Sequence, residues 1–403
     1  PMIGAEGEAF RQARPDLDAR GAKGVTDLVD LALQQARQGG ASDVHLTPTP
    51  SGLEMRWRID GVLHLVDVLP LAVSPNVVAR LKVLSDLLTY RTDVPQEGRI
   101  RSDPGEVEMR VSTFPTLHGE KAVVRLFAAS GHFERLNDLG LPGEIRDGLS
   151  ELLRETSGAV VFAGPAGSGK TTTLYACLRE IASISGGSRS LASLEDPIEA
   201  AVSGVAQSQV NPSVGFDLAA GVRSLLRQDP EVIAVGEIRD RGTAEGALGA
   251  SLTGHLVLTT FHAGSASGLV GRLLDMGIEP YVLRSGLLAV VCQRLARRLC
   301  ECSVESSSDE ARLGLPVATV RLPAGCSQCG NTGYSGRLAL AEWLVTRQGE
   351  VARAVLEKQD VRAIESAAIE AGMVPLGRRA VEAVERGLTS PQEVRRVLGV
   401  SRL

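Results

Sequence analysis

Residues 164–171 read Gly164-Pro165-Ala166-Gly167-Ser168-Gly169-Lys170-Thr171, a complete phosphate-binding loop of the G-x-x-x-x-G-K-T type that runs on into Thr172. The preceding residues, 159–163, are apolar and partly β-branched, as expected of a buried parallel strand. Residues 172–178 are predicted to form a helix. A strand, a glycine loop and a helix start direct several backbone N–H groups at one point, which predicts an anion site.

The last two residues of this loop, Lys170 and Thr171, predict that the bound anion is a nucleotide with a metal ion. Lys170 offers a positive charge to the β- and γ-phosphates, and Thr171 offers its hydroxyl to Mg²⁺. The alternative is a chance glycine-rich turn, which the flanking strand and helix disfavour. A guanine-binding Asn-Lys-x-Asp signature is absent from the sequence, so ATP is expected rather than GTP. None of the lysines follows an asparagine: they are Lys23, Lys82, Lys121, Lys170 and Lys358.

Length and composition set the broad class. A chain of 403 residues with 43% hydrophobic residues is expected to hold two or three domains with real cores. A net charge of −5 argues against a general surface for polyanions, so no specific nucleic acid is expected as a partner. The apolar runs are shorter than the ~18 residues of a membrane span. Few, clustered cysteines suit a reducing compartment, so the predicted location is cytoplasmic.

The pattern of apolar residues divides the chain into a small α+β domain and a larger α/β domain. Helical spacing occurs at 25–38 and 77–88, and strand alternation at 53–59 leads into the turn signal Asp60-Gly61. Strands are also predicted at 62–65, 107–114, 121–127, 159–163, 191–194, 232–235 and 255–260, with a loop excursion at 303–320. The expected divisions are a flexible leader at 1–24, the first domain at 25–130, a linker at 131–140 and the α/β domain at 141–403, helical from about 346.

Two acidic groups follow predicted strands of the second domain. Glu237 ends the apolar run 232–236, where a P-loop enzyme needs a carboxylate facing Mg²⁺. Glu195 or Asp196 ends the run before it, where either could polarise an attacking water. The alternatives are a surface glutamate after a buried strand and an Asp-Pro turn.

Histidines and arginines near these strands are weaker candidates. His255 and His262 frame a predicted strand, where a sensor of the γ-phosphate is well placed, although a structural role is the commoner fate of histidine. Arginine side chains can stabilise the negative charge that develops on a transferred phosphoryl group, because they stay cationic and donate hydrogen bonds in a planar fork. Composition alone assigns none of them. They are Arg223, Arg227 and Arg239 around the second acidic strand, and Arg110 and Arg125 in the first domain.

Four cysteines form two close pairs, Cys300 with Cys302 and Cys326 with Cys329. Four thiolates from two turns can close a tetrahedral structural Zn²⁺ site. The second pair has the standard C-x-x-C spacing, whereas the first is one residue short. The alternative is a loop with free thiols.

Together these motifs resemble the traffic ATPases of type II secretion and type IV pilus assembly. The similarity runs from about residue 25 to the C-terminus and is carried by ordered matches. The first-domain matches are residues 41–45, 56–61, 96–99, 110–113 and 118–120; those of the second domain are the P-loop, 195–199, 226–230, 236–240, 253–262, 326–329 and 333–337.

The resemblance implies a RecA-like P-loop ATPase domain preceded by a smaller PAS-like α+β domain, with a zinc-motif insertion at about 299–337. By residue it implies the Walker A pair Lys170 and Thr171, Glu195 in the acidic box, Glu237 in Walker B, His255 and His262 in the histidine box, nucleotide-reaching Arg110 and Arg125, site arginines Arg223 and Arg227, and the zinc-binding cysteines. It also implies ATP, Mg²⁺ and Zn²⁺ as cofactors.

The same resemblance implies a homohexamer that works on an inner-membrane platform protein and docks on a membrane-anchored partner. The long N-terminal docking domain of many members is expected to be absent or reduced to residues 1–24, and the start at Pro1 suggests trimming. Two alternatives stay open. One is a conjugative DNA-secretion ATPase, which the cysteines disfavour; the other is a scaffold that binds nucleotide without hydrolysis, which Glu195 and Glu237 disfavour.

Overall fold

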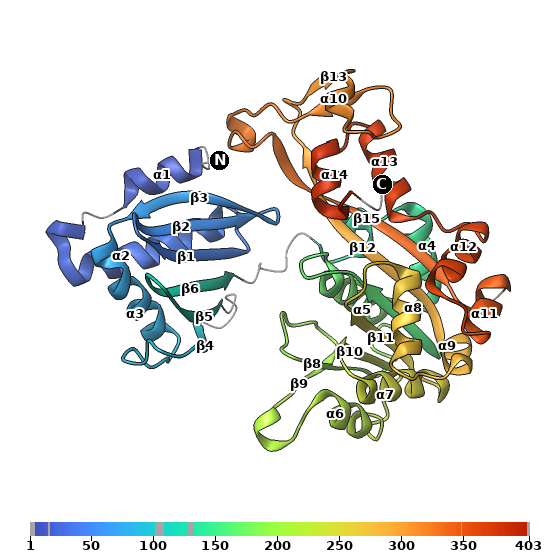
Figure 1. Ribbon diagram of the computed structural model, residues 1–403. Helices are drawn as coiled ribbons and strands as arrows, with labels where there is room; N and C mark the ends of the chain where they lie inside the picture. Colours follow the sequence, from blue (N-terminus) through green and yellow to red (C-terminus); the bar gives the residue numbers. More distant parts are fainter. Residues whose placement is uncertain (1–4, 15–16, 101–108, 127–132, 348, 401–403) are drawn as a thin grey trace. The chain divides into compact units, whose positions relative to one another are not determined.

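The computed structural model describes residues 5–14, 17–100, 109–126, 133–347 and 349–400 (Figure 1). It divides into two units. The first comprises Pro1–Ala129 with Leu299–Val304 and Leu322–Gly336, and the second comprises the remaining residues from Ser130. The division at 129/130 lies beside the predicted linker, whose first residues, 131–132, fall outside the described residues. The two segments Leu299–Val304 and Leu322–Gly336 are the beginning and end of the predicted zinc-motif insertion. They belong to the first unit, although we expected them in the ATPase domain.

The first unit is built on a six-stranded antiparallel sheet in the order β3-β2-β1-β6-β5-β4. Its other elements are helices α1, α2 and α3 with one 3-10 turn. Their bounds are α1 (Ala5–Ala13), α2 (Leu17–Gln38), β1 (Asp43–Thr49), β2 (Gly52–Ile59), β3 (Val62–Leu69), η1 (Leu71–Val73), α3 (Ser74–Leu84), β4 (Gln96–Ile100), β5 (Met109–Thr116) and β6 (Gly119–Leu126).

Alternation in the strands creates one apolar and one polar face in this sheet. Leu53, Met55 and Trp57 of β2 are buried in one core together with residues of α2 and α3. The α+β class expected for this part of the chain is thereby confirmed. Residues 107–108 of the predicted strand 107–114 lie outside the described residues.

The expectation of a flexible leader is wrong for the described part of residues 1–24. Helix α1 occupies Ala5–Ala13, and α2 begins at Leu17 rather than at Val25. Phe10 is fully buried, and its ring meets that of Trp57 edge-on, with centroids 5.9 Å apart and planes at 72°. One aromatic side chain, buried in the core, anchors this segment, although its polar composition gave no sign of such an anchor.

The second unit contains a seven-stranded sheet in the order β15-β12-β7-β11-β10-β8-β9 and the remaining helices. The elements up to β11 are η2 (Leu136–Leu139), α4 (Gly143–Leu152), β7 (Gly158–Ala163), α5 (Lys170–Ser185), β8 (Leu191–Glu195), β9 (Ala206–Gln209), η3 (Pro212–Val214), α6 (Leu218–Leu225), β10 (Val232–Ile238), α7 (Arg241–Leu252) and β11 (Leu256–Phe261).

The chain continues from β11 through the end of the sheet to a helical C-terminal region. These elements are α8 (Ala266–Asp275), α9 (Pro280–Gly286), β12 (Leu287–Leu299), β13 (Val304–Ser306), α10 (Asp309–Arg312), β14 (Val320–Leu322), η4 (Ser327–Cys329), β15 (Tyr334–Val345), α11 (Gly349–Leu356), α12 (Val361–Glu370), α13 (Leu376–Glu385) and α14 (Pro391–Leu398). The expected loop excursion at 303–320 holds β13, α10 and the start of β14, and β13 pairs with β14.

The four strands predicted for the second domain are present as β7, β8, β10 and β11, and they pair in parallel. β7 and β11 are buried along their whole length, and helices α5 and α7 pack against them. This confirms the α/β class with a RecA-like, mainly parallel sheet. Parallel strands end at one edge of a sheet, so the residues that follow β7, β8, β10 and β11 gather there. No helix among the described residues has the length and apolar character needed to cross a bilayer.

Candidate functional site

The loop between β7 and α5 has a backbone that only glycine accommodates easily. Gly164 and Gly169 have φ values of 150° and 88°. A Cβ atom on Gly164 would lie 2.3 Å from Ser168 Oγ and 2.6 Å from the carbonyl oxygen of Gln293. The Ser168 hydroxyl is buried and has no hydrogen-bond partner among the described residues. A tight glycine loop with an unpartnered buried hydroxyl fits a bound phosphate.

Lys170 is the first residue of α5 and is only 8% exposed. Its Nζ donates to the carbonyl oxygens of Gly164 and Pro165, both at 2.9 Å, which uses two of its three donors. Burial lowers the pKa of Lys170, and the negative charge of Glu237 opposes that shift more than any other charge. Thr171 follows in the first turn and is half-buried. The P-loop residues therefore form one site, as the sequence predicts.

Glu237 lies near the end of β10, at the same edge of the sheet as the P-loop. Both of its carboxylate oxygens are engaged. Arg239 Nε donates to Oε2 at 2.6 Å, and His262 Nε2 lies 2.7 Å from Oε1. The Glu237 side chain is 16% exposed. A partly buried carboxylate that acts on Lys170 is placed as a P-loop enzyme requires for binding Mg²⁺.

The structure contradicts the expectation that Glu195 polarises water. Glu195 is 3% exposed and accepts hydrogen bonds from Tyr175 Oη, Ser193 Oγ and Gln207 Nε2. Three donors fill most of the roughly four acceptor sites of this enclosed carboxylate, which leaves little room for an attacking water. Asp196 is exposed, and it accepts from Arg239 Nη1 at 2.9 Å.

Sequence reasoning missed Glu199, the second glutamate of the stretch Glu195-Asp196-Pro197-Ile198-Glu199. Glu199 is exposed, and its charge is among those that raise the pKa of Lys170 against the effect of burial. The signal was present in the sequence, because this glutamate lies only four residues after Glu195.

The two histidines lie at opposite ends of β11. His262 follows the carboxyl end and reaches Glu237. His255 precedes the amino end, where its Nδ1 lies 3.1 Å from the carbonyl oxygen of Ala250. The structure therefore brings His262 to the P-loop edge and does not bring His255 there.

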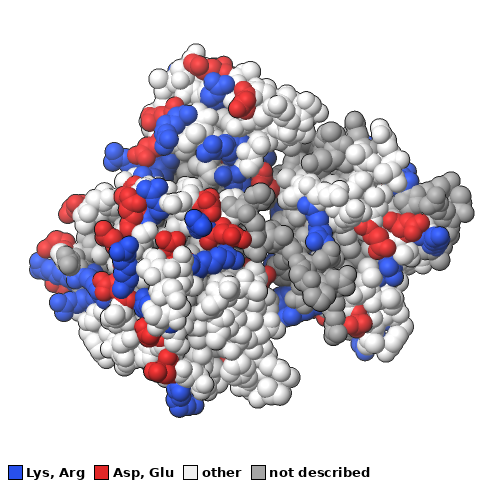
Figure 2. All heavy atoms as spheres, turned by 180° about the vertical axis from the view of Figure 1, so that it is seen from behind, with Lys and Arg blue, Asp and Glu red and all other residues white. Residues whose placement is uncertain are grey.

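The four predicted arginines fall into two pairs. Arg110 and Arg125 of the first unit are cross-strand partners on β5 and β6, and Arg125 Nε donates to Asp43 at 3.1 Å. Arg223 lies in the last turn of α6 and Arg227 just beyond it, and both are exposed. On the face drawn in Figure 2, acidic and basic side chains are interspersed rather than gathered into one basic patch.

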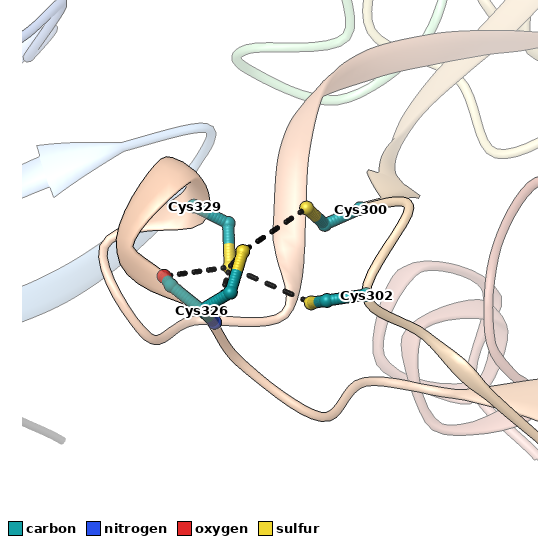
Figure 3. A group of neighbouring side chains, drawn as sticks. All are labelled: Cys300, Cys302, Cys326 and Cys329. Carbon is teal, nitrogen blue, oxygen red and sulfur yellow. Dashed lines mark hydrogen bonds between the residues drawn. The ribbon is translucent and has the colours of Figure 1, made fainter.

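The four clustered cysteines point their sulfur atoms at one another (Figure 3). All four Sγ atoms lie within 4.8 Å of one another. The Cys300–Cys326, Cys302–Cys329 and Cys326–Cys329 separations are 3.8, 3.9 and 3.7 Å. A tetrahedral site with Zn–S bonds of about 2.3 Å separates its sulfur atoms by ~3.8 Å. The shortened C-x-C pair therefore still brings each of its two sulfur atoms to tetrahedral distance from one sulfur atom of the second pair.

Backbone donors support a thiolate at Cys329. The N–H groups of Cys326 and Gly333 both donate to Cys329 Sγ at 3.2 Å. Burial disfavours the charged form, but these donors and the neighbouring thiols outweigh it and lower the pKa of Cys329 to about 6. Since the thiolate is the form that binds metal, this cluster could hold a zinc ion.

Comparisons with known proteins identify the family of this chain. The model of a family described as "Type II/IV secretion system protein" matches residues 18–396. The type II secretion system protein E of Aeromonas hydrophila is 40% identical over 399 residues, which cover 97% of this chain and 79% of that protein. The type II secretion system ATPase E of Vibrio cholerae is 39% identical, with 93% and 75% covered. A type IV pilus assembly ATPase, TfpB of Acinetobacter baylyi, is 38% identical, with 93% and 65% covered.

Solved structures show the same fold at lower identity. The ATPase DotB of Legionella pneumophila superposes with a TM-score of 0.66 at 23% identity, covering 91% of this chain and 94% of that one. The pilus retraction motor PilT, solved with bound ADP, gives a TM-score of 0.59 at 23% identity, with 92% and 96% covered.

Proposed function

Since this chain belongs to the family of type II and type IV secretion system proteins, we propose that it works as a hexameric motor whose ATP hydrolysis drives assembly of a pilus or pseudopilus. Its relatives are named as ATPases of type II secretion and of type IV pilus assembly, and the chain is an ATPase motor of that kind. The hexamer, the metal ions and the partners are the parts of this proposal that go beyond family membership.

The proposal is supported by the residues that meet at one edge of the parallel sheet, where β7 and β10 end. There Lys170, bonded to two loop carbonyls, lies in the field of Glu237, which is itself fixed by Arg239 and His262. Thr171 and Glu237 are the residues that would hold Mg²⁺, which neutralises charge on the phosphate oxygens when bound. Lys170 holds the β/γ-phosphates, and the glycine loop supplies N–H donors without a side chain in the way.

We assign a structural role to the metal that the cysteines would hold. Cys300, Cys302, Cys326 and Cys329 would bind one Zn²⁺ and fix two turns to each other. The chemistry of ATP does not require this ion. The proposal is supported by three sulfur separations of 3.7–3.9 Å, close to the ~3.8 Å of a tetrahedral site, with all four Sγ atoms within 4.8 Å of one another.

The partners of the proposed motor are an inner-membrane platform protein and a membrane-anchored docking protein. We place the motor on the cytoplasmic side of that membrane, bound there through these partners. Support comes from the relatives, whose names assign them to secretion and to pilus assembly. The net charge of −5 supports a protein partner over a nucleic acid.

The test is a measurement of Mg²⁺-dependent ATP turnover by purified protein, alone and with the cytoplasmic part of the platform protein. Lys170→Ala is the matched inactive variant. We expect turnover that rises with the platform protein, and sedimentation of six copies in the presence of an ATP analogue. Turnover stimulated by single-stranded DNA instead would favour the conjugative alternative. Tight ATP binding without hydrolysis even in the presence of the platform protein would favour a scaffold.

A further inference from the structure

One hydroxyl connects the P-loop helix to the acidic stretch that follows β8. Tyr175 lies on α5, five residues after Lys170, and is 4% exposed. Its Oη donates to Glu195 Oε2 and accepts the backbone N–H of Glu199 at 3.0 Å. The two ends of the segment Glu195–Glu199 are therefore held by the same atom of α5.

The Glu195 carboxylate completes this connection from the other side. Its Oε1 accepts from Ser193 Oγ at 2.6 Å and from Gln207 Nε2 at 2.9 Å. Gln207 of β9 also donates to the carbonyl oxygen of Ala200 at 3.1 Å and accepts from the N–H of Val202 at 2.7 Å. Residues 195–202 are thus tied to α5 through a tyrosine and to β9 through a glutamine.

The protonation state of the tyrosine is fixed by its surroundings. Burial, and after it the hydrogen bond to Glu195, raise the pKa of Tyr175. The phenol therefore remains a neutral donor at every pH at which the protein works. A neutral donor facing a buried carboxylate makes a strong, directional contact.

The segment held in this way ends in an exposed carboxylate. Glu195 is buried, whereas Glu199 is exposed and its charge acts on Lys170. A change in the position of Glu199 thus changes the electrostatic field at the phosphate-binding lysine. Its backbone N–H is the group that Tyr175 anchors.

We propose that Tyr175 and Glu195 are positioning residues, which fix the segment Glu195–Glu199 to the P-loop helix and so set where the Glu199 carboxylate stands relative to Lys170. The proposal rests on the ATPase function proposed above, because it concerns the same nucleotide site. Neither residue transfers a proton. Each acts through Glu199, and their effect is on the rate of hydrolysis rather than on nucleotide binding.

Two substitutions separate positioning from proton transfer. Tyr175→Phe keeps the ring and removes the hydroxyl, so the anchor of Glu199 is lost. We expect kcat to fall by about 10- to 100-fold, the size of effect that a small misplacement of a catalytic group produces, while KM for ATP stays within about twofold. Glu195→Gln keeps an oxygen that can accept from Tyr175, so kcat should fall by less than about tenfold, whereas loss of a general base costs about 10²- to 10⁴-fold.

Amide hydrogen exchange gives a readout that does not depend on turnover. In Tyr175→Phe the N–H of Glu199 loses its acceptor, so peptides that cover 196–202 should exchange faster, while peptides of β10 and β11 should not change. Tyr281→Phe is the matched control, since Tyr281 is 61% exposed in the same unit. The double variant Tyr175→Phe/Glu195→Gln should be little worse than Tyr175→Phe, because without the tyrosine hydroxyl residue 195 no longer acts on Glu199 through Tyr175.

The outcomes distinguish this proposal from the function on which it rests. If wild type and Tyr281→Phe hydrolyse no ATP with the platform protein present, the proposed function fails. If both hydrolyse ATP and Tyr175→Phe keeps the wild-type kcat, the positioning proposal alone fails. A Glu195→Gln variant that folds, binds ATP and loses kcat by more than about a hundredfold also overturns it, since a proton acceptor behaves in that way. This variant decides the matter even if Tyr175→Phe does not fold.

Discussion

The side-chain amide of Gln293 donates to the carbonyl oxygen of Ser168 at 2.8 Å and ties the middle of β12 to the P-loop. The same side chain accepts from Thr173 Oγ1 at 3.1 Å and is 2% exposed. A Cβ on Gly169 would lie 2.9 Å from Gln293 Nε2, so the loop passes directly over this amide. β12 thus supports the phosphate loop from a part of the sheet that contributes none of the sequence motifs.

Gln293→Leu should destabilise both the protein and the loop. It leaves the buried carbonyl of Ser168 without its donor, which costs about 1–3 kcal/mol of the free energy of unfolding. Urea unfolding and titration with a fluorescent ATP analogue measure the loss of stability and of affinity. Gln228→Leu is the control at an exposed glutamine and should stay within ~0.5 kcal/mol. Wild-type stability and affinity in Gln293→Leu would mean that the loop holds its shape without β12.

Lys170→Ala should abolish productive nucleotide binding. The variant removes the cation that two loop carbonyls hold at the site of the β/γ-phosphates. Analogue titration and the ATPase rate are the measurements, with Lys358→Ala, an exposed lysine of the C-terminal region, as the control. If Lys170→Ala binds and hydrolyses ATP like wild type, the nucleotide site lies elsewhere.

Glu237→Gln should leave ATP bound but slow its hydrolysis. The amide keeps the shape of the side chain and loses the charge that would engage Mg²⁺. It also weakens the contacts to Arg239 and His262, so His262→Ala is a useful second variant with a smaller expected effect. Single-turnover kinetics with prebound ATP separate chemistry from binding. A wild-type rate in Glu237→Gln would show that this carboxylate is a bystander.

The parts of the site that local sequence determines were predictable. The P-loop, the strand before it and the glutamate that ends β10 each lie within one short stretch, where periodicity and glycine spacing carry the signal. The α/β class with a mainly parallel sheet followed from strands alternating with helices, and the family resemblance implied the RecA-like fold. The four cysteines were also identified from spacing alone.

The errors concern contacts between residues distant in the chain. Tyr175 and Glu195 are 20 residues apart, and Gln293 lies 125 residues from Ser168, so no local pattern indicated that either pair meets. His255 and His262 were predicted to frame one strand, and the carboxyl end of β11, where His262 lies, is the end at the P-loop edge. β12 was not predicted, although its first six residues, 287–292, form an uninterrupted apolar run before Gln293.

Elemental analysis should find about one Zn²⁺ per chain, held by the four cysteines. Cys302→Ser should lower zinc occupancy and thermal stability, because a serine hydroxyl is a poor zinc ligand at neutral pH. Cys177→Ala is the control for zinc occupancy, since that buried cysteine lies on α5 and outside the cluster. A metal-free protein of undiminished stability would show that the thiols remain free.

Arg110 and Arg125 should matter for hydrolysis more than for binding of ADP. They are cross-strand partners on β5 and β6. Arg125 pairs with Asp43, and its side chain is 65% exposed. The resemblance to secretion and pilus ATPases implies that both arginines reach bound nucleotide, and arginine suits the γ-phosphate because it stays cationic and bonds in a planar fork.

On this reasoning, Arg110→Ala and Arg125→Ala should each lower kcat far more than they weaken ADP binding, because ADP has no γ-phosphate to contact. Stopped-flow titration with ADP and with a non-hydrolysable ATP analogue, together with steady-state turnover, measures the difference. Arg91→Ala is the control, since Arg91 is a half-exposed arginine of the same unit that pairs with Asp93. If both variants keep the wild-type kcat and bind the ATP analogue normally, these arginines are ordinary surface residues. The charge that stabilises the γ-phosphoryl group must then come from Arg223 and Arg227, whose alanine variants would carry the loss of kcat instead.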